Sequence, residues 1–240
     1  MYSLIFYSHS DYSDSWKPMF GQTDKYFDAS FEKYLFVNAG DHSTPDGWHT
    51  IEYDDNLPYQ QRVSSCLKKL PAEKVVVFHH EDMFLYNTPQ LEKMGVIERM
   101  IEDEEAHFVK LCKATYRPHE FYLEKKKDIF QCPPDLAFAI QPTMCKVKNL
   151  LAVYEQTPGD NIWEFEANSN LTCSKNQMIC CFVNQIGEKR VGMFHWESLT
   201  YPYIATAIVK GKWNTEGYAN ELGYIFEEYS IDSSSRGTNT

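Results

Sequence analysis

The sequence predicts an α/β protein with one mixed, mostly parallel sheet flanked by helices, and three observations predict this fold class. A short apolar run, Val75 to Phe78, has the composition of a central strand that is buried on both faces. Two further strand-like runs, Tyr2 to Tyr7 (YSLIFY) and Lys33 to Val37 (KYLFV), precede it. Segments with helical periodicity alternate with such runs, as they do in α/β domains.

The remaining elements are predicted from hydrophobic periodicity and from the positions of proline and glycine. Leu57 to Leu70 carries apolar residues at 3.6-residue spacing, with Pro58 in its first turn, and predicts an amphipathic helix. Further helices are expected at Ser13 to Phe20, Pro89 to Ile101, Pro142 to Tyr154 and Tyr218 to Tyr229, and a short one contains Trp163 to Glu166. Further strands are expected at Thr50 to Tyr53, His107 to Ala114, Leu136 to Ile140, Ile179 to Val183 and Arg190 to Phe194.

The chain reads as one domain followed by a short tail. Its 240 residues are enough for one large α/β domain, and we find neither an internal repeat nor a linker. Residues 1–230 are therefore predicted to form a single domain. Residues 231–240 are predicted to be a disordered tail, because Ser233 to Thr240 is too polar to pack.

Composition narrows the possible partners and the compartment. The net charge of −11 argues against a nucleic acid, because phosphate backbones are bound by clustered Lys and Arg. The seven cysteines are odd in number and lack CxxC spacing, so we expect reduced thiols in a cytoplasmic protein. No apolar run reaches membrane-spanning length, and the N-terminus lacks a basic region, so we expect neither insertion nor export.

A polar cluster follows the central strand directly. His79, His80, Glu81 and Asp82 stand where the strand should leave the sheet, and ligand crevices of open α/β sheets lie at this edge. In an extended chain His80 and Asp82 point to one face, and His79 and Glu81 to the other. His80 and Asp82 could therefore share one small ligand such as a divalent ion. The alternative is an exposed polar loop.

Two other segments carry candidate binding groups. Ser8, His9, Ser10 and Asp11 follow the first strand and could hydrogen-bond a nucleobase or ribose, or could simply form a turn. Arg62 flanks the buried stripe of its helix, and a half-buried arginine needs an anion. Either Asp54 or Asp55, as a structural ion pair, or a ligand phosphate could supply that anion.

The stretch WEFE contains one glutamate that can face a site beside the tryptophan. Trp163 and Glu166 are three residues apart and share a helix face. Glu164 is turned roughly 200° away from Glu166, at about 100° per residue. Glu166 is therefore the candidate for a role in a site, and the alternative is that it only caps or pairs within a packed helix.

The order of these motifs resembles that of a known enzyme family. The succession YSHSDYSDSW, YDDNLPYQQR, HHEDMFL, AIQP and WEFE is similar to that of small GT-A-fold glycosyltransferases of bacteria and large DNA viruses, over roughly Ser3 to Tyr229. The resemblance implies a GT-A-like, Rossmann-type fold, and in a virus it implies the host cytoplasm. In that family a D-x-D-type motif after a central strand binds a divalent cation that grips the diphosphate of a nucleotide sugar.

The resemblance also implies roles for particular residues. His80-Glu81-Asp82 stands in the place of the D-x-D motif, so Asp82 becomes the metal ligand and His80 occupies the place of the first aspartate. A late histidine often completes the metal site, and His195 is the matching candidate, although a lone histidine is more often structural. The residues implied to bind the nucleotide sugar are Ser8, His9, Ser10, Asp11, Asp55, Arg62, His80, Glu81, Gln141 and Trp163.

These expectations combine into one reaction. A divalent cation, Mn²⁺ or Mg²⁺, would stabilise the charge that develops on the leaving diphosphate. Glu166 would act as the base toward a hydroxyl of a glycan acceptor if the reaction inverts the anomeric centre, with Trp163 as the platform for a sugar ring. The expected function is thus transfer from a nucleotide sugar, with UDP implied by family analogy. The alternatives are a sugar-phosphate nucleotidyltransferase and an inactive carbohydrate-binding protein of the same fold.

Overall fold

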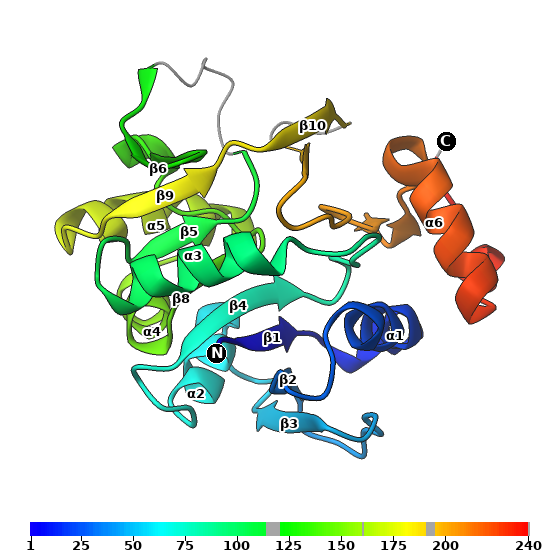
Figure 1. Ribbon diagram of the computed structural model, residues 1–240. Coiled ribbons are helices and arrows are strands. Elements are labelled where there is room, and N and C mark those ends of the chain that lie inside the picture. The colour runs from blue at the N-terminus through cyan, green and yellow to red at the C-terminus, as the bar shows by residue number, and fades with distance from the viewer. Residues whose placement is uncertain (114–120, 160, 191–194, 240) are drawn as a thin grey trace.

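A mixed, mostly parallel sheet forms the centre of the protein and is flanked by helices, so the predicted fold class is confirmed (Figure 1). The structure is a computed structural model that describes residues 1–113, 121–159, 161–190 and 195–239. Within these residues the sheet has the strand order β3-β2-β1-β4-β8-β5-β9-β7-β6. Its strands are β1 Ser3–Tyr7, β2 Lys33–Asn38, β3 Trp48–Tyr53, β4 Val75–His80, β5 Phe108–Lys110, β6 Glu124–Lys126, β7 Ile129–Gln131, β8 Thr143–Lys146 and β9 Cys180–Val183.

The directions of the strands bring several connecting segments to one edge of the sheet. Strands β3, β2, β1 and β4 are mutually parallel, so the segments that follow them emerge at the same carboxyl edge. Strand β8 runs antiparallel between β4 and β5, and β7 runs antiparallel to β9. Two small antiparallel pairs lie outside the large sheet: β10 Ile186–Lys189 with β11 Trp196–Ser198, and β12 Ile208–Val209 with β13 Lys212–Trp213.

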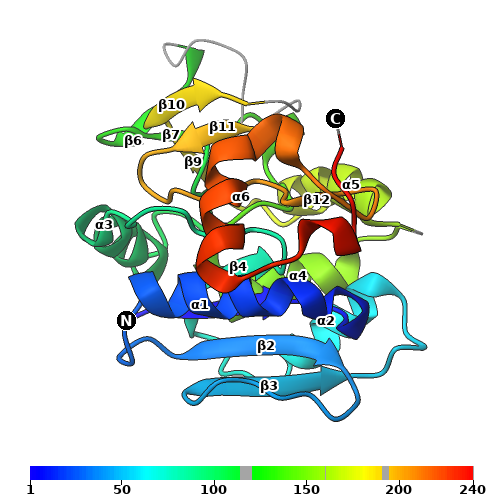
Figure 2. The same ribbon diagram turned by 90° about the vertical axis from the view of Figure 1, so that its right-hand side faces the viewer.

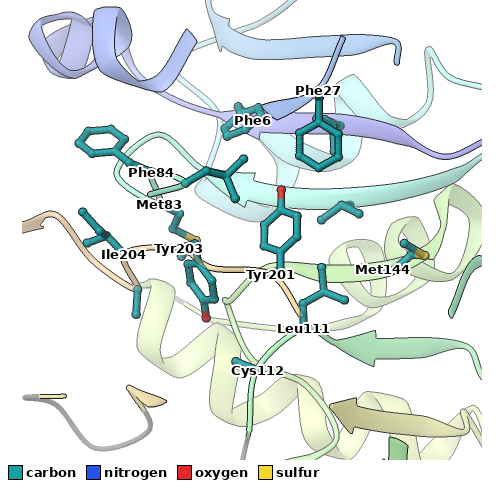
Figure 3. Packing of buried hydrophobic residues seen from close by; sticks show 14 of the residues in the cluster. Phe6, Phe27, Met83, Phe84, Leu111, Cys112, Met144, Tyr201, Tyr203 and Ile204 are labelled. Carbon is teal, nitrogen blue, oxygen red and sulfur yellow. The ribbon is translucent and has the colours of Figure 1, made fainter. Parts of the chain in front are cut away.

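Helices cover both faces of the sheet, and each face has its own apolar core. One core includes side chains of α1 Trp16–Tyr26, α3 Leu91–Glu102 and α6 Thr215–Tyr229. The other includes side chains of α2 Tyr59–Leu67, α4 Val147–Gln156 and α5 Ile162–Lys175. Because side chains alternate along a strand, Val75 and Val77 of β4 enter the first core and Val76 and Phe78 the second. Figure 3 shows part of the first core, where Tyr201 lies between Phe27 and Leu111.

The predicted strand Leu136–Ile140 and the predicted helix start at Pro142 are both wrong. Residues Pro134–Leu136 form a 3-10 turn, the strand β8 begins at Thr143, and α4 begins at Val147. The amides of Phe138 and Ile140 donate to side chains of α5 instead of to a strand ladder. All four residues of β8 are buried between β4 and β5, so pairing with these strands overrides the helical pattern.

Two further expectations concern the last third of the chain. Of the predicted strand Arg190–Phe194, residues 191–194 lie outside the described residues. The tail, which the sequence predicts to be disordered, is described up to residue 239 and contacts the rest of the chain. Trp213 N donates to Gly237 O, Asn239 N donates to Trp213 O, and the Arg236 guanidinium pairs with Asp14. These hydrogen bonds and the ion pair hold a polar segment that has too few apolar side chains to pack by itself. Among the described residues, the helices are too short or too polar to span a bilayer.

The packing of α5 on the preceding loop yields a stability prediction. A Cβ atom at Gly159 would lie 2.7 Å from the backbone nitrogen of Phe165, whereas a Cβ atom at Gly223 in α6 would meet no atom within 4 Å. We expect Gly159→Ala to lower the free energy of unfolding by about 1–3 kcal/mol, because backbone atoms must shift. The matched control Gly223→Ala should raise it by about 0.5–1 kcal/mol. Urea denaturation measures both, and an unchanged stability of Gly159→Ala would contradict the close approach.

Candidate functional site

His9, Asp55 and Arg62 meet at the carboxyl edge of the sheet. His9 follows β1, and Asp55 lies between β3 and α2, which carries Arg62. His9 Nε2 lies 3.2 Å from Asp55 Oδ2, and Arg62 Nη1 lies 2.9 Å from Asp55 Oδ1. Arg62 Nε donates to Leu57 O at 2.6 Å, and its Nη2 donates to Asp55 O at 2.6 Å. The anion of Arg62 is thus Asp55, whereas Asp54 accepts hydrogen bonds from Asn56.

The first turn contains both structural and accessible groups. Ser8 is fully buried, and its Oγ accepts a hydrogen bond from Trp16 Nε1 at 2.7 Å, so this hydroxyl shapes the turn and cannot meet a ligand. Ser10 is bonded through its backbone and side chain to Asn38. His9 Nδ1 accepts from Asp11 N at 3.1 Å, and the carboxylate of Asp11 is exposed. The groups of this turn that face solvent are those of His9, Ser10 and Asp11.

The end of β4 sends its two histidines to opposite faces, as the alternation predicts. His79 Nε2 lies 2.5 Å from the Tyr201 hydroxyl, and its ring stacks on Phe6 with centroids 4.4 Å apart. His80 Nε2 lies 2.9 Å from the Tyr59 hydroxyl, which in turn lies 2.9 Å from that of Tyr154. Burial lowers the pKa of His79 to about 3 and that of His80 to about 4, so both rings are neutral near pH 7.

The expectation that His80 and Asp82 share one ligand by alternation is wrong. A turn follows His80, in which Met83 N donates to His80 O at 3.1 Å, so the extended geometry ends there. Asp82 Oδ2 instead accepts from Thr206 Oγ1 at 2.8 Å and from Ile208 N at 3.3 Å. His80 belongs to the hydrogen-bonded chain with Tyr59, and Asp82 belongs to the contact with the segment after β11.

Glu81 and Asp82 form an acidic pair at this edge, in which Glu81 is buried and Asp82 is half-buried. Glu81 is 9% exposed, and burial together with the neighbouring charge of Asp82 raises its pKa to about 8. Burial also raises the pKa of Asp82, against the effect of its hydrogen bonds. Two adjacent carboxyls that resist ionisation are typical of sites that receive a proton or a cation.

The carboxylate oxygens of Glu81 and Asp82 are donor atoms of the kind that bind a hard divalent cation, when substrate phosphates supply further ligands. Mg²⁺ and similar ions are often bound by one or two carboxylates together with substrate phosphates and water. Over the residues that the structure describes, no group of three or more His, Cys, Asp or Glu side chains could hold a metal ion. His195 lies just before β11, where its carbonyl accepts from Arg190 N at 2.8 Å. Its role as a metal ligand stays a prediction.

Glu166, Gln141 and Trp163 lie around the loop that precedes β8. Glu166 Oε2 accepts a hydrogen bond from Ile140 N at 2.9 Å, and Gln141 Oε1 accepts from the Tyr203 hydroxyl at 2.6 Å. Glu166 is partly buried, whereas Glu164 is exposed. Trp163 is 79% exposed at the start of α5. The two glutamates of WEFE therefore differ as helical geometry predicts.

Sequence reasoning missed several residues at this edge. Tyr59 and Tyr154 hold His80, and both could have been suspected only as members of helical stripes. Arg236 comes from the tail, where its Nε donates to Asp14 Oδ2 at 2.5 Å and its guanidinium lies 5.0 Å from the ring centroid of Tyr12. Figure 2 shows this C-terminal segment, in red, beside the start of α1. No local signal indicates such a contact between the two ends of the chain.

A groove borders the same edge. A cavity of about 870 Å³ lies between α2 and the end of α4, and its wall includes Leu57, Gln61 and Tyr154. Leu57 accepts the hydrogen bond of Arg62, and Tyr154 ends the chain that begins at His80. Leu57 and Tyr154 therefore both line the groove and hold residues of the candidate site in place.

No protein-family model matches the sequence, and no curated protein matches it. Among solved structures, a match is found with a UDP-glucose pyrophosphorylase complexed with UDP-glucose, with a TM-score of 0.47 and 7% sequence identity. The match covers 79% of this chain and 93% of that chain. A likeness at this level assigns no function to the chain.

The burial of His79 predicts a pH dependence of stability. Its pKa is near 3 in the folded chain and near 6.5 when unfolded, so the unfolded state takes up a proton first as the pH falls. The contribution of a neutral His79 is fully present above pH 6.5 and is lost below it, by up to about 1.4 kcal/mol per pH unit.

The variant His79→Gln cannot take up this proton. Its free energy of unfolding should therefore fall less steeply than that of the wild type between pH 6.5 and pH 4, whatever its stability at pH 7.5. Urea denaturation across this range measures both slopes. Parallel slopes for the two proteins would show that His79 does not titrate in this way.

Proposed function

We propose that the protein is a metal-dependent glycosyltransferase that transfers a sugar from a nucleotide sugar, with UDP as the nucleotide, to a hydroxyl of a glycan acceptor. One observation carries the proposal: the acidic pair of buried Glu81 and half-buried Asp82 lies at the same sheet edge as the cluster of His9, Asp55 and Arg62. An acidic centre can take a cation, and hydrogen-bonding groups beside it can take the nucleoside. The motif order described above also supports this function.

Asp82 is the residue best suited to hold the metal. Its Oδ2 accepts hydrogen bonds from Thr206 Oγ1 and Ile208 N, which fix the carboxylate. A bound divalent cation would act as a Lewis acid on the departing diphosphate. Glu81 lies next to it in the acidic pair, and His195 stays a candidate for a further ligand.

The nucleotide sugar would lie across the edge between the first turn and the loop before β8. His9, Ser10 and Asp11 present polar groups to the nucleoside, while Arg62 holds Asp55 in place. Gln141 is fixed by Tyr203 and would position the sugar, with Trp163 available as a platform for a ring. Neutral His80 would serve as a positioning residue through Tyr59.

Glu166 is the proposed base for an inverting reaction. The hydrogen bond from Ile140 N to Oε2 fixes the side chain, which leaves Oε1 to accept the proton of an acceptor hydroxyl. If the reaction retains the configuration of the anomeric carbon, the same carboxylate would hold hydroxyls of the acceptor or the donor.

A product screen tests this function against its alternatives. The protein is incubated with a panel of UDP- and GDP-sugars, with and without added pyrophosphate, in the presence of Mn²⁺ or of EDTA. We expect Mn²⁺-dependent release of UDP. A nucleotidyltransferase would instead form UTP from a UDP-sugar and pyrophosphate, and a binding protein would form no product with any sugar nucleotide. Either of these results would overturn the proposal.

Removing the charge of Asp82 should remove metal-dependent nucleotide binding. In Asp82→Asn the amide keeps the hydrogen bonds from Thr206 and Ile208 through its oxygen, but it lacks the anionic charge that the cation needs. We expect calorimetry to show loss of Mn²⁺-dependent UDP binding at unchanged melting temperature. The exposed residue Asp103 provides the control Asp103→Asn, which should bind as the wild type does. Unchanged UDP binding by Asp82→Asn would refute the assignment.

The two glutamates of WEFE should respond differently to the same substitution. Glu166→Gln keeps an acceptor for Ile140 N but removes the basic carboxylate, so kcat should fall roughly a hundredfold or more while donor Kd barely changes. The exposed Glu164 is the matched control, and Glu164→Gln should cost little. Measuring kcat, donor Kd and melting temperature separates the roles. Equal losses in the two variants, or a loss that follows stability alone, would exclude Glu166 as the base.

A further inference from the structure

A separate cavity lies between α1 and α6. Its volume is about 320 Å³, which is near the lower end of the range for small-molecule sites. Figure 2 shows α6 lying across α1. The wall consists of side chains from these two helices and one from the loop after β4: Gln22, Lys25, Tyr26, Tyr86, Asn220, Glu221, Tyr224, Ile225 and Glu228.

Aromatic rings make up one part of this wall. Tyr26, Tyr86 and Tyr224 all line the cavity, and Tyr224 is 74% exposed. Rings of this kind offer a flat apolar face together with a hydroxyl group. The cavity can therefore contact a ligand that is apolar on one face and polar at its edge.

The charged groups of the wall are already matched within the protein. Lys25 Nζ lies 2.8 Å from Glu228 Oε1, and Gln22 Nε2 donates to Glu228 Oε2 at 2.9 Å. The guanidinium of Arg190 pairs with Glu221. A charged ligand would have to compete with these pairs, so the wall favours a neutral one.

One acceptor atom in the wall has no partner among the described residues. The side chain of Glu221 is 13% exposed, and Arg190 donates to its Oε1. Its Oε2 is buried and accepts no hydrogen bond from any residue that the structure describes. This oxygen is closed to solvent and to the cavity, so a ligand must bond to other polar groups of the wall, such as the hydroxyl of exposed Tyr224 and the amide of exposed Asn220.

We propose that this cavity binds a sugar residue of a carbohydrate, as a second site apart from the proposed transfer site. A pyranose presents C–H groups to aromatic rings and hydroxyl donors and acceptors around its rim. The three tyrosines match the first property, and the hydroxyl of Tyr224 with the exposed amide of Asn220 matches the second. An apolar ligand would leave these polar groups unsatisfied, and an anion would face Glu221 and Glu228.

Saturation-transfer difference NMR on the full chain tests the proposal. The probes are methyl glycosides of glucose, galactose, mannose, N-acetylglucosamine, xylose and fucose at millimolar concentration, with EDTA and without nucleotide. We expect at least one glycoside to receive saturation from the wild-type protein. Because neither metal, nucleotide nor turnover is involved, the result is independent of the proposed transferase activity.

Variants then locate the binding. Tyr224→Ala removes an exposed ring, so the fold should survive while affinity for the bound glycoside falls roughly tenfold, the scale of one aromatic contact. Asn220→Ala should weaken binding as well. The matched control is Phe121→Ala, because Phe121 is a 73% exposed aromatic residue elsewhere on the chain, and it should bind as the wild type does. Absence of a signal with every glycoside, or equal binding by Tyr224→Ala and the wild type, would overturn the proposal.

Discussion

The hydrogen bonds between Asp82 and the segment from Thr206 to Ile208 join the end of β4 to the part of the chain that leads to α6. The carboxylate accepts from Thr206 and Ile208, and the carbonyl of Asp82 accepts from Ala207 N at 2.9 Å. Backbone contacts continue this junction, since Ile204 N donates to Phe84 O. A carboxylate that is withdrawn from water needs such partners. Asp82, a residue of the candidate site, therefore positions the segment that leads to α6.

At the end of β4 the ionisable groups that can carry charge are the two neighbouring carboxyls. Burial keeps His79 and His80 neutral, and each ring is fixed by a tyrosine hydroxyl. The carboxyls of Glu81 and Asp82 are thus the acidic groups at this strand end, and the charge of Asp82 opposes ionisation of Glu81. The arginines nearby are already engaged, Arg62 by Asp55 and Arg236 by Asp14. A ligand that brings a dication would relieve the repulsion within the acidic pair without breaking these ion pairs.

Helix α1 separates the two proposed ligand regions. It begins beside the first turn, next to His9 to Ser15, and its last turns supply Gln22, Lys25 and Tyr26 to the cavity under α6. Its 11 residues span about 16 Å at 1.5 Å per residue. A saccharide in the cavity would therefore not compete with a nucleotide at the first turn. The two proposals can be true independently, and one rigid helix fixes the distance between them.

Local patterns in the sequence determined the central strands, the amphipathic helices and the gathering of polar groups at one sheet edge. The run Val75–Phe78, the stripe of α2 and the opposite faces of Glu164 and Glu166 are properties of a few consecutive residues, and the structure confirms them. The sequence left Asp54, Asp55 or a ligand phosphate as the anion of Arg62, and the structure shows Asp55. Each of these features depends on which residues are apolar and on the periodicity of a helix or strand. Both can be seen in a short segment of sequence.

Contacts between distant segments decided the rest. Only the tertiary structure shows that β8 fills the position between β4 and β5, that Asp82 pairs with Thr206, and that Arg236 packs against the first turn. The sequence predicts that the Ser8 hydroxyl can meet a ligand, but in the structure this hydroxyl accepts a hydrogen bond from Trp16 Nε1. In each case a buried polar group or an unpaired strand edge finds a partner far away in the sequence. Local periodicity cannot identify that partner, because the choice depends on which surfaces the whole fold brings together.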